Sequence, residues 1–463
     1  MIESDLPPVD EELLLRMSRP GPRYTSYPTA PVWRDDLGDA DARAALRRAA
    51  EHPDEPLSLY VHIPFCRRRC LFCGCTVEIT RREDRVERYL DALEREIDMV
   101  SGELGGRRSV VQLHFGGGTP THLSPTELRR VFERLRGSFR IETGAELSIE
   151  VHPHVTHLEH VETLAELGFN RISMGVQDTD AHVQAVVHRD QTVEETARLV
   201  ERCRELGFLG INMDLMYGLP AQTEETFART LGTVVGMRPD RLAVYGYAHV
   251  PWLKPTQKVL EREHLPDPVE RAHLFAVAIH ELSSAGYRVI GLDHFARETD
   301  ALYESLLAGT MHRNFMGYTT HPAEDMVAFG MSSISDVGGA FLQNARQNKD
   351  YERLVAAEEI PAVRGMVRSP EDDLRRAVIQ ELMCRMELDL DRLEARFERC
   401  DLEEHFREEW KELEPLAREG FCDLEERRVR VLPRGRLFLR HLAMVFDAYL
   451  EPRPGEHRFS QTI

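Results

Sequence analysis

Four of the eight cysteines of the chain lie within ten positions, in the stretch CRRRCLFCGC that begins at Cys66. Cys66, Cys70 and Cys73 form a C-x3-C-x2-C pattern, and Cys75 follows two residues later. Structural zinc sites fill four positions, usually from two separated pairs of ligands, and this run lacks such pairs. Three thiolates from one loop fit an iron–sulfur cubane better, because they leave one iron free for another ligand. The pattern therefore favours a 4Fe–4S cluster on Cys66, Cys70 and Cys73 over zinc or redox thiols.

A glycine-rich stretch, GGGTPT at residues 116–121, follows the next apolar run along the chain. Glycines let the backbone approach a ligand closely and can direct N–H groups at its carboxylate. Taken alone, such a stretch is as often a structural bend. Its position one apolar run after the cysteines makes it a candidate part of the same ligand site.

The segments around these motifs alternate between short apolar runs and amphipathic stretches. Strands are predicted at residues 57–63, 110–115, 146–151, 171–176, 211–217, 241–247 and 287–291. Helices are predicted between them; one begins where Ser124 and Glu127 form a capping box around Pro125. Strands spaced by roughly 30 residues, with helices between them, predict right-handed βαβ units and a parallel sheet. Six or more such units predict an α/β fold, a full or partial (β/α) barrel.

The motifs share one position relative to the predicted strands. HIPFC, FGGGTPT, EVHP, GVQD, DLMYGLP and YAHVP all fall where a predicted strand ends. In (β/α) barrels the chemistry lies at the C-terminal ends of the strands. We therefore expect one site to collect residues from all six stretches.

Three regions of the chain differ in composition and in predicted secondary structure. Residues 1–55 are predicted to be an irregular, proline-rich N-terminal segment that covers the site, and residues 56–365 the barrel. Residues 366–463 are predicted to form a small, mainly helical C-terminal domain. In that domain Ser369 and Pro370 begin a helix, and the stretch from Phe421 onward predicts a β-hairpin followed by a helix, similar to a winged helix.

Composition narrows the class of protein. The 463 residues are 42% hydrophobic and 30% charged, with no secretory signal and no apolar run of about 18 residues that could span a membrane. A cytoplasmic protein is expected, in which clustered cysteines bind metal more often than they form disulfides. The net charge of −20 argues against nucleic-acid binding. An acidic substrate must therefore be met by a local basic cluster.

The C-x3-C-x2-C pattern directly after a first strand resembles the signature of the radical S-adenosylmethionine enzymes. The wider sequence resembles one family among them, the oxygen-independent coproporphyrinogen III oxidases, over nearly the whole chain. The stretches that carry this resemblance include PRYTSYPTA (22–30), YVHIPFC (60–66), CGC (73–75), DLMYGLPAQT (214–223), HRNFMGYTT (312–320) and PRGRLFLRHLAMVFDAYL (433–450).

The resemblance implies a reaction and its cofactors. Family members oxidatively decarboxylate two propionate groups of coproporphyrinogen III to vinyl groups, giving protoporphyrinogen IX in heme biosynthesis. They use a 4Fe–4S cluster and two S-adenosylmethionine molecules, and a 5′-deoxyadenosyl radical removes hydrogen from the unactivated β-carbon. The resemblance also implies an electron donor such as flavodoxin or ferredoxin, and a monomer.

The resemblance assigns roles to particular residues. Those around the first S-adenosylmethionine are Tyr60, Gly117, Glu150 and Ile334. Those around the second are Phe72, Gly118, Thr119, Gln177, Arg189, Asp214 and Ala248. Without this context, Ile334 and Ala248 would be interpreted as core residues and Arg189 as part of a surface ion pair.

Cys75 resembles the fourth cysteine of the coproporphyrinogen-oxidising group, which is not a cluster ligand. In an extended loop its side chain would point to the opposite side from that of Cys73, toward the second cofactor or the substrate. Tyr24 and Tyr27, in the PRYTSYPTA stretch, either lie near the substrate as catalytic residues or anchor a surface segment.

Some features leave alternatives open. His152 and His154 stand where the family usually has Asp and Arg, and the pair could also suggest a metal site. The arginines at 67–69 could meet the carboxylates of the substrate or the electron donor, or form a solvated loop face. A heme-binding chaperone and a radical methyltransferase of the same fold are the competing functions. A nucleic-acid role for the arginine-rich hairpin stretch RRVRVLPRGR is a further alternative.

Overall fold

The computed structural model describes residues 11–450, which are organised around a twelve-stranded sheet. The central strands of this sheet are mutually parallel, in the order β13-β1-β4-β5-β6-β7-β8. They are β1 (Leu57–Ile63), β4 (Ser109–Gly117), β5 (Arg140–Val151), β6 (Arg171–Gln177), β7 (Gly210–Tyr217), β8 (Arg241–Gly246) and β13 (Asp325–Phe329). All the strands predicted between residues 57 and 247 are present, which confirms the parallel α/β class.

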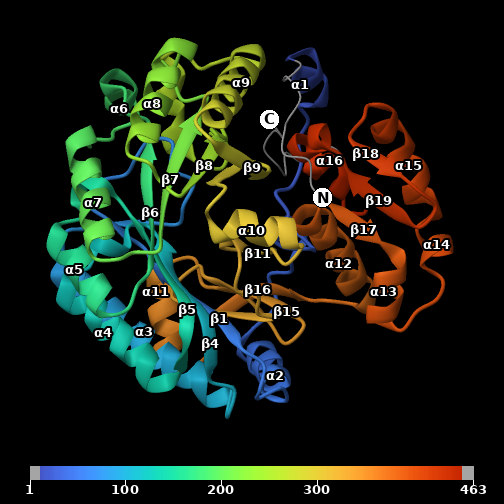
Figure 1. The fold of residues 1–463 in the computed structure, drawn as a ribbon. Coiled ribbons are helices and arrows are strands. Elements are labelled where there is room, and N and C mark those ends of the chain that lie inside the picture. Colours follow the sequence, from blue (N-terminus) through green and yellow to red (C-terminus); the bar gives the residue numbers. More distant parts are fainter. Residues whose placement is uncertain (1–10, 451–463) are drawn as a thin grey trace.

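Helices cover the outer face of the curled sheet (Figure 1). They are α3 (Glu83–Glu103), α4 (Pro125–Ser138), α5 (Leu158–Glu166), α6 (Ala181–Val186), α7 (Val193–Glu205), α8 (Glu224–Gly236) and α9 (Pro268–Ser284). The predicted capping box of α4 is present, because the Ser124 side chain accepts from the Glu127 N–H and the Glu127 side chain accepts from the Ser124 N–H. Local capping chemistry thus sets where this helix begins.

The two ends of the sheet are antiparallel, which the sequence analysis did not predict. At one end β10 (His294–Arg297) lies between β8 and β9 (Tyr287–Gly291) and runs antiparallel to both. The turn between β9 and β10 is too short for a parallel crossover, which needs a dozen residues or more. At the other end β14 (Ile334–Val337), β15 (Ala340–Asn344) and β16 (Ala362–Val367) form a meander. Because β9 and β16 are the edge strands, the barrel is partial.

The N-terminal segment contains helices where an irregular chain was expected. These are α1 (Glu11–Met17) and α2 (Asp39–Ala50). The side chains of Ala42, Ala45 and Leu46 on α2 are buried, and α2 packs against α3. Between α1 and α2 the chain passes between the barrel and the C-terminal elements, as the blue trace in Figure 1 shows. The alanine- and arginine-rich sequence of residues 39–50 is the helical signal that was missed.

The C-terminal part is mainly helical and carries a small sheet. Its helices are α12 (Pro370–Arg385), α13 (Leu390–Phe397), α14 (Leu402–His405), α15 (Arg407–Arg418) and α16 (Leu439–Met444). Its strands are β17 (Glu387–Asp389), β18 (Cys422–Leu424) and β19 (Arg428–Val431), in the order β17-β19-β18. The predicted hairpin is β18–β19, and β17 adds a third strand that was not predicted.

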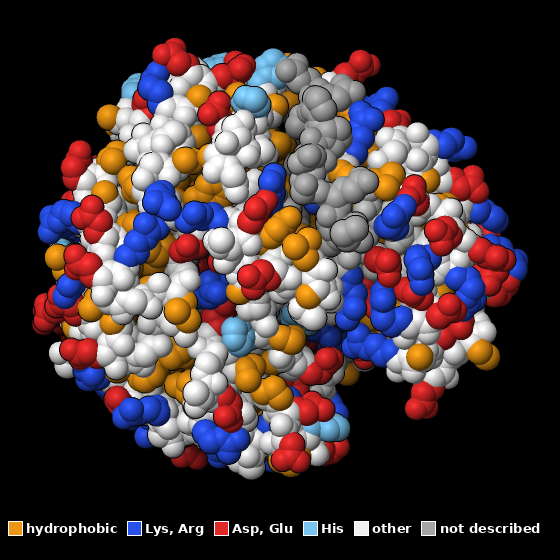
Figure 2. Space-filling model, viewed as in Figure 1, with side chains coloured by type: hydrophobic (Ala, Val, Ile, Leu, Met, Phe, Trp, Pro, Cys, Tyr) orange, Lys and Arg blue, Asp and Glu red, His pale blue; other side chains and the backbone are white. Residues whose placement is uncertain are grey.

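The remaining elements are short. They are β2 (Phe65–Cys66), β3 (Glu78–Ile79), α10 (Ala301–Ala308), β11 (His312–Asn314), β12 (Gly317–Thr319) and α11 (Asn348–Ala356), with 3-10 turns at Ala30–Val32, Pro120–His122, Pro153–Val155, Pro255–Arg262 and Pro433–Phe438. In residues 11–450 no helix has the length and apolar character needed to cross a lipid bilayer. Basic and acidic side chains are intermingled over the face shown in Figure 2.

A buried carboxyl group joins α3 to the sheet. Glu96 accepts hydrogen bonds from the Tyr351 hydroxyl at 2.6 Å, the Gly330 N–H at 2.7 Å and the Asn344 amide at 2.5 Å. Burial outweighs these donors and raises the pKa of Glu96 from its ordinary 4.5 to about 7. Ionised Glu96 is therefore less favourable in the folded chain than in the unfolded chain.

The raised pKa predicts a pH-dependent stability. The contribution of Glu96 is fully present below about pH 4.5 and is lost as the pH rises to about 7, by about 3 kcal/mol in the free energy of unfolding. We expect Glu96→Gln to flatten the pH dependence of the denaturant midpoint between pH 5 and pH 8. Equal pH dependence in the wild type and the variant would show that Glu96 ionises normally.

Candidate active site

The parallel register brings the predicted strand-end stretches to one end of the barrel. Tyr60 on β1 pairs with His114 on β4, and Glu150 on β5 pairs with Ser173 on β6. Because these strands run in the same direction, the residues that follow them emerge at the same edge of the sheet. The cysteine loop follows β1, and the glycine stretch follows β4.

The three cysteines of the C-x3-C-x2-C pattern lie in one loop, held against two other strand-end loops. Cys66 ends β2, and its Sγ lies 3.4 Å from Thr119 Oγ1 in the glycine stretch. Cys70 Sγ lies 3.5 Å from Arg189 Nη1, in the segment after α6. Burial raises the pKa of the Cys66 thiol to about 11. The thiols of Cys66 and Cys70 thus face the loops that carry other predicted site residues.

The relation between Cys73 and Cys75 corrects the expectation that their side chains point apart. The Cys75 thiol donates a hydrogen bond to the Cys73 sulfur. The loop bends at Cys75, so the alternation of an extended strand does not apply. This hydrogen bond outweighs burial and lowers the pKa of the Cys73 thiol, and it raises the pKa of Cys75. Cys75 itself is exposed.

The donor set of this loop fits an iron–sulfur cluster. Cluster ligands must be thiolates, and cationic groups stabilise them; Arg189 lies beside Cys70, and Arg69 and Lys254 act on Cys73. Within the described part of the chain, no three His, Cys, Asp or Glu side chains converge closely enough to hold a single metal ion. Thiolates of a cubane each bind a different iron and need no common point.

The glycine stretch is shaped by close packing against β1. A Cβ atom on Gly117, whose φ is 118°, would lie 2.7 Å from the His62 imidazole, and one on Gly118 would lie 2.7 Å from the Pro64 carbonyl oxygen. The N–H groups of this stretch bind protein acceptors: Gly117 donates to Glu150 at 3.1 Å and Gly118 to the Ile63 carbonyl at 2.8 Å. In this structure both N–H groups thus have protein acceptors, and the expectation that N–H groups of the glycine stretch point at a ligand carboxylate stays a prediction.

Two carboxyl groups on neighbouring strands differ in ionisation. Burial alone would raise the pKa of Glu150, but hydrogen bonds from His114 and Gly117 outweigh it and lower the pKa. Asp214 on β7 accepts from Ser173 at 3.0 Å and Asn212 at 2.8 Å. Burial and the nearby Glu150 raise the pKa of Asp214 to about 6. The site thus contains one firmly ionised carboxylate and one that titrates close to neutral pH.

Two histidines belong to the site although the sequence analysis did not select them. His62 Nδ1 lies 3.1 Å from the Tyr60 hydroxyl, and the His114 ring stacks on the Tyr60 ring with centroids 6.0 Å apart. Burial raises the pKa of Tyr60 well above its usual value. The available signal was strand alternation, because Tyr60 and His62 share one face of β1.

Arg189 is buried, which excludes the alternative of a surface ion pair. Arg189 is 7% exposed. Its Nη2 atom donates to the Gly175 carbonyl and, at 3.0 Å, to the side-chain oxygen of Gln191. Arg189 Nε and the side-chain oxygen of Gln177 are buried without a hydrogen-bond partner among the described residues. Gln177 has a φ of 68°, a conformation uncommon for a residue with a side chain. Both groups are thus available to a polar ligand.

The two histidines that depart from the family pattern have separate surroundings. Burial, followed by the charge of Arg189, lowers the pKa of His152 to about 2, so this ring is neutral. His154 Nδ1 lies 3.2 Å from Glu195 on α7. His152 therefore lies close to Arg189 without adding a second charge, whereas His154 faces the surface helix.

Three further predicted residues lie at different parts of the barrel rim. The carbonyl oxygens of Phe72 and Ala248 both accept from the Gln257 amide, at 2.9 and 3.2 Å. This shared donor holds the cysteine loop beside the loop that follows β8. Ile334 begins β14 at the other end of the sheet, and its side chain is half-buried.

Tyr24 and Tyr27 are placed against the C-terminal elements. The Tyr24 hydroxyl donates to Asp447 at 2.9 Å, and the Tyr27 hydroxyl accepts from the Ala448 N–H at 3.0 Å. Both side chains are buried. Their hydroxyl contacts support the anchoring interpretation, and these contacts do not bring them together with the cysteine loop.

Two of the three arginines at 67–69 contact other residues of the chain. Arg68 forms an ion pair with Asp190 at 2.5 Å, and Arg69 donates to the Val77 carbonyl at 3.4 Å. Arg67 is exposed and lines an open hollow with His122.

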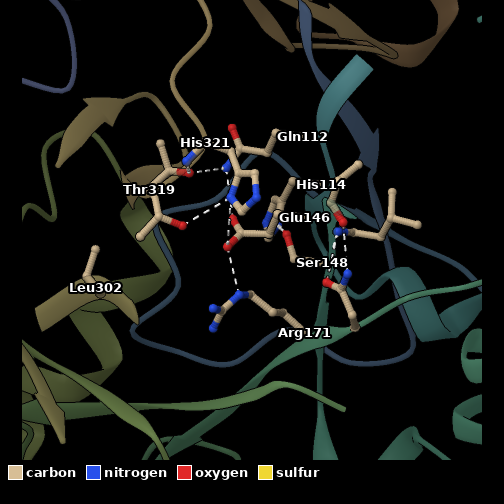
Figure 3. A network of polar contacts seen from close by, with 12 residues as sticks. Gln112, His114, Glu146, Ser148, Arg171, Leu302, Thr319 and His321 are labelled. Atoms are coloured by element: carbon tan, nitrogen blue, oxygen red, sulfur yellow. Dashed lines mark hydrogen bonds and ion pairs between the residues drawn. The ribbon is translucent and has the colours of Figure 1, made fainter. Parts of the chain in front are cut away.

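A polar cavity of about 150 Å³ continues from Glu150 and Asp214 down the barrel interior. At its other end, Arg171 contacts Glu146 at 2.7 Å, and Gln112 binds Glu146 at 3.0 Å (Figure 3). Arg171 is the first residue of β6, so this network marks the N-terminal end of the barrel. The barrel interior is therefore polar along much of its length.

Comparisons with known proteins match most of the chain. The Radical SAM superfamily model matches residues 60–234, and the HemN C-terminal domain model matches residues 369–438. The chain is 41% identical to the oxygen-independent coproporphyrinogen III oxidase of Escherichia coli (strain K12), with 98% of each chain covered. Identity to the Pseudomonas aeruginosa protein of the same name is 42%, again with 98% of each covered.

One solved structure matches almost the whole fold. It is described as coproporphyrinogen III oxidase (HemN) from Escherichia coli, a radical SAM enzyme, and has a TM-score of 0.90 and 41% identity. The match covers 96% of this chain and 100% of the other.

Proposed function

Because the chain belongs to the family of oxygen-independent coproporphyrinogen III oxidases, which are radical S-adenosylmethionine enzymes, we propose that it converts two propionate groups of coproporphyrinogen III to vinyl groups. The product would be protoporphyrinogen IX, for heme biosynthesis. The observation that carries this proposal is the position of Cys66, Cys70 and Cys73 at the same barrel end as Glu150 and Asp214, in a chain that matches the family over its full length.

Cys66, Cys70 and Cys73 would hold the 4Fe–4S cluster that the family implies. When bound, the cluster supplies the electron that cleaves S-adenosylmethionine, so that hydrogen can be removed from an unactivated carbon. Thr119 and Arg189 position the Cys66 and Cys70 side chains through the contacts described above. The surrounding loops bury each of these three cysteines in part.

We propose that S-adenosylmethionine binds among the strand-end residues in two copies. Ionised Glu150 suits an ammonium or a ribose hydroxyl of the first, and Arg189, with its unpaired Nε, suits a carboxylate of the second. The first set would be Tyr60, Gly117, Glu150 and Ile334. The second would be Phe72, Gly118, Thr119, Gln177, Arg189, Asp214 and Ala248.

The remaining predicted residues receive different roles. We propose that Cys75 contacts the second cofactor or the substrate, because it is exposed beside Cys73 and donates to it. Tyr24 and Tyr27 would anchor the N-terminal segment through Asp447 and Ala448. We further propose a monomeric, cytoplasmic protein that takes electrons from a flavodoxin or ferredoxin.

The proposed activity is tested with anaerobically reconstituted protein, coproporphyrinogen III, a reductant and S-adenosylmethionine. We expect a monovinyl intermediate followed by the divinyl product, measured by chromatography after oxidation to the porphyrins. Tight heme binding without any vinyl product would contradict the proposal and favour a heme chaperone. Methylated product without decarboxylation would favour a methyltransferase.

A further inference from the structure

Three arginines from distant parts of the chain meet at the open side of the barrel. Arg23 belongs to the N-terminal segment, Arg313 to β11 and Arg440 to α16. Arg23 forms an ion pair with Asp293, in the turn between β9 and β10, and its carbonyl oxygen accepts from Arg313 Nη2 at 3.3 Å. Arg440 is close enough to Arg23 and Arg313 for their charges to act on it. We call Arg23, Arg313 and Arg440 the arginine cluster.

The arginine cluster borders the cavity that also contains the site carboxylates. The Arg23 guanidinium lies over the Tyr245 ring, 5.0 Å from its centroid, and that of Arg313 lies 4.6 Å from the Tyr318 ring centroid. Both tyrosines line the cavity of about 150 Å³, together with Glu150 and Asp214. Only one aromatic layer thus separates the arginine cluster from the candidate active site.

Asp293 is the carboxylate that the described contacts place beside the arginine cluster. Asp293 forms the ion pair with Arg23, and it also lies 2.8 Å from His294 Nδ1. Burial, followed by the charge of Arg23, lowers the pKa of Arg440 to about 10. Asp293 is thus already engaged by Arg23 and His294, and among the described residues Arg313 has no ion pair with a carboxylate.

The guanidinium of Arg313 has buried donors without acceptors in the described part of the chain. The residue is 6% exposed, and its Nε and Nη1 atoms are buried without a hydrogen-bond partner among the described residues. Buried polar groups are nearly always paired, so an orphaned guanidinium calls for a ligand. Both atoms are donors of a cationic group, and a carboxylate oxygen is the acceptor with which such donors form the strongest hydrogen bonds.

We propose that the arginine cluster binds propionate carboxylates of the substrate, holding the macrocycle while another propionate reacts. The inference rests on the proposed function, because it takes coproporphyrinogen III, with its four propionates, as the ligand. It supplies the local basic cluster that a chain with a net charge of −20 needs for an acidic substrate. Conversion removes two of the four carboxylates, so the product is held less tightly than the substrate.

The test is a binding titration that needs no turnover. Reconstituted full-length protein is titrated anaerobically with coproporphyrin III, the stable oxidised tetracarboxylate, and binding is followed by porphyrin fluorescence. We expect Arg313→Gln to weaken binding by about 10- to 150-fold, the size of one charge-assisted interaction. Arg313→Lys should give an intermediate loss, and the tetramethyl ester should bind the wild type and Arg313→Gln equally weakly.

The matched control is Arg202→Gln on α7, whose guanidinium is paired with Glu162 and Glu205 at the surface. It should bind coproporphyrin III as the wild type does. If Arg313→Gln does not fold, the same titration is made with Arg23→Gln. The Arg23 side chain is 39% exposed, so its replacement disturbs the packing less than that of Arg313. Wild-type affinity in a folded Arg313→Gln or Arg23→Gln variant overturns the proposal, as does a loss seen only with Arg67→Gln.

The two proposals fail in different ways. If the wild type binds coproporphyrin III through the arginine cluster but forms no vinyl product, the proposed function fails and the carboxylate site stands. If the wild type forms vinyl product while the arginine variants bind normally, the carboxylate site fails and the proposed function stands.

Discussion

Replacing Cys66, Cys70 or Cys73 by alanine is expected to abolish vinyl formation and to remove the iron from the protein. A cubane held by three thiolates loses a third of its protein ligands with each substitution, and the exchangeable iron offers no compensation. The wild type should contain about four irons per chain and be brown and oxygen-sensitive. Iron analysis and the visible absorption spectrum of anaerobically purified protein measure this directly.

Cysteines outside the loop provide the control. Cys203 is buried on α7 and Cys400 is exposed in the C-terminal part, and neither contacts the cysteine loop in the described structure. Cys400→Ala should retain the iron and the activity. Stoichiometric zinc without iron absorbance in the wild type, or iron retained in all three alanine variants, would contradict the ligand assignment.

Replacing Cys75 by serine is expected to leave the cluster in place and to reduce vinyl formation by about 100-fold, because a serine hydroxyl is far less acidic than a thiol and replaces it poorly as a positioned proton donor or acceptor. Cys75 donates a hydrogen bond to Cys73, and a serine hydroxyl of similar size keeps that donor. The iron content and spectrum should therefore stay near those of the wild type. What changes is the thiol that faces the proposed second cofactor or the substrate.

Two outcomes would defeat this role of Cys75. Loss of iron in Cys75→Ser would make Cys75 a cluster ligand and would leave no vacant iron for S-adenosylmethionine. Full activity with normal iron would reduce Cys75 to a packing residue beside Cys73. Comparison with Cys75→Ala separates the hydrogen bond from the sulfur, because alanine removes both.

The order of strands and helices could be predicted because its signals are local. Apolar runs marked the strands β1, β4, β5, β6, β7, β8 and β9, and the capping residues around Pro125 and Pro370 marked helix starts at α4 and α12. The antiparallel strand β10 and the meander β14–β16 were missed, because these strands have only four to six residues each and give short apolar runs. The helix α2 was missed because neighbouring prolines suggested an irregular segment.

The site was predictable to the extent that strand ends share one edge of a parallel sheet. That rule placed Glu150, Asp214 and the cysteine loop at one barrel end. It gave no information on side-chain direction within loops, so the approach of Cys75 to Cys73 was not foreseen. The arginine cluster was also invisible in the sequence, because its members are separated by more than a hundred residues and meet only through tertiary packing.

The central claim, that this chain couples cleavage of S-adenosylmethionine to decarboxylation of propionates, is tested most directly by the ratio of two products. Anaerobic reactions with coproporphyrinogen III are stopped over time, and 5′-deoxyadenosine and vinyl groups are both quantified. The account predicts one 5′-deoxyadenosine for each vinyl group, hence two for each divinyl product. Vinyl groups formed without S-adenosylmethionine, or 5′-deoxyadenosine formed with no vinyl group in the presence of substrate, would contradict it.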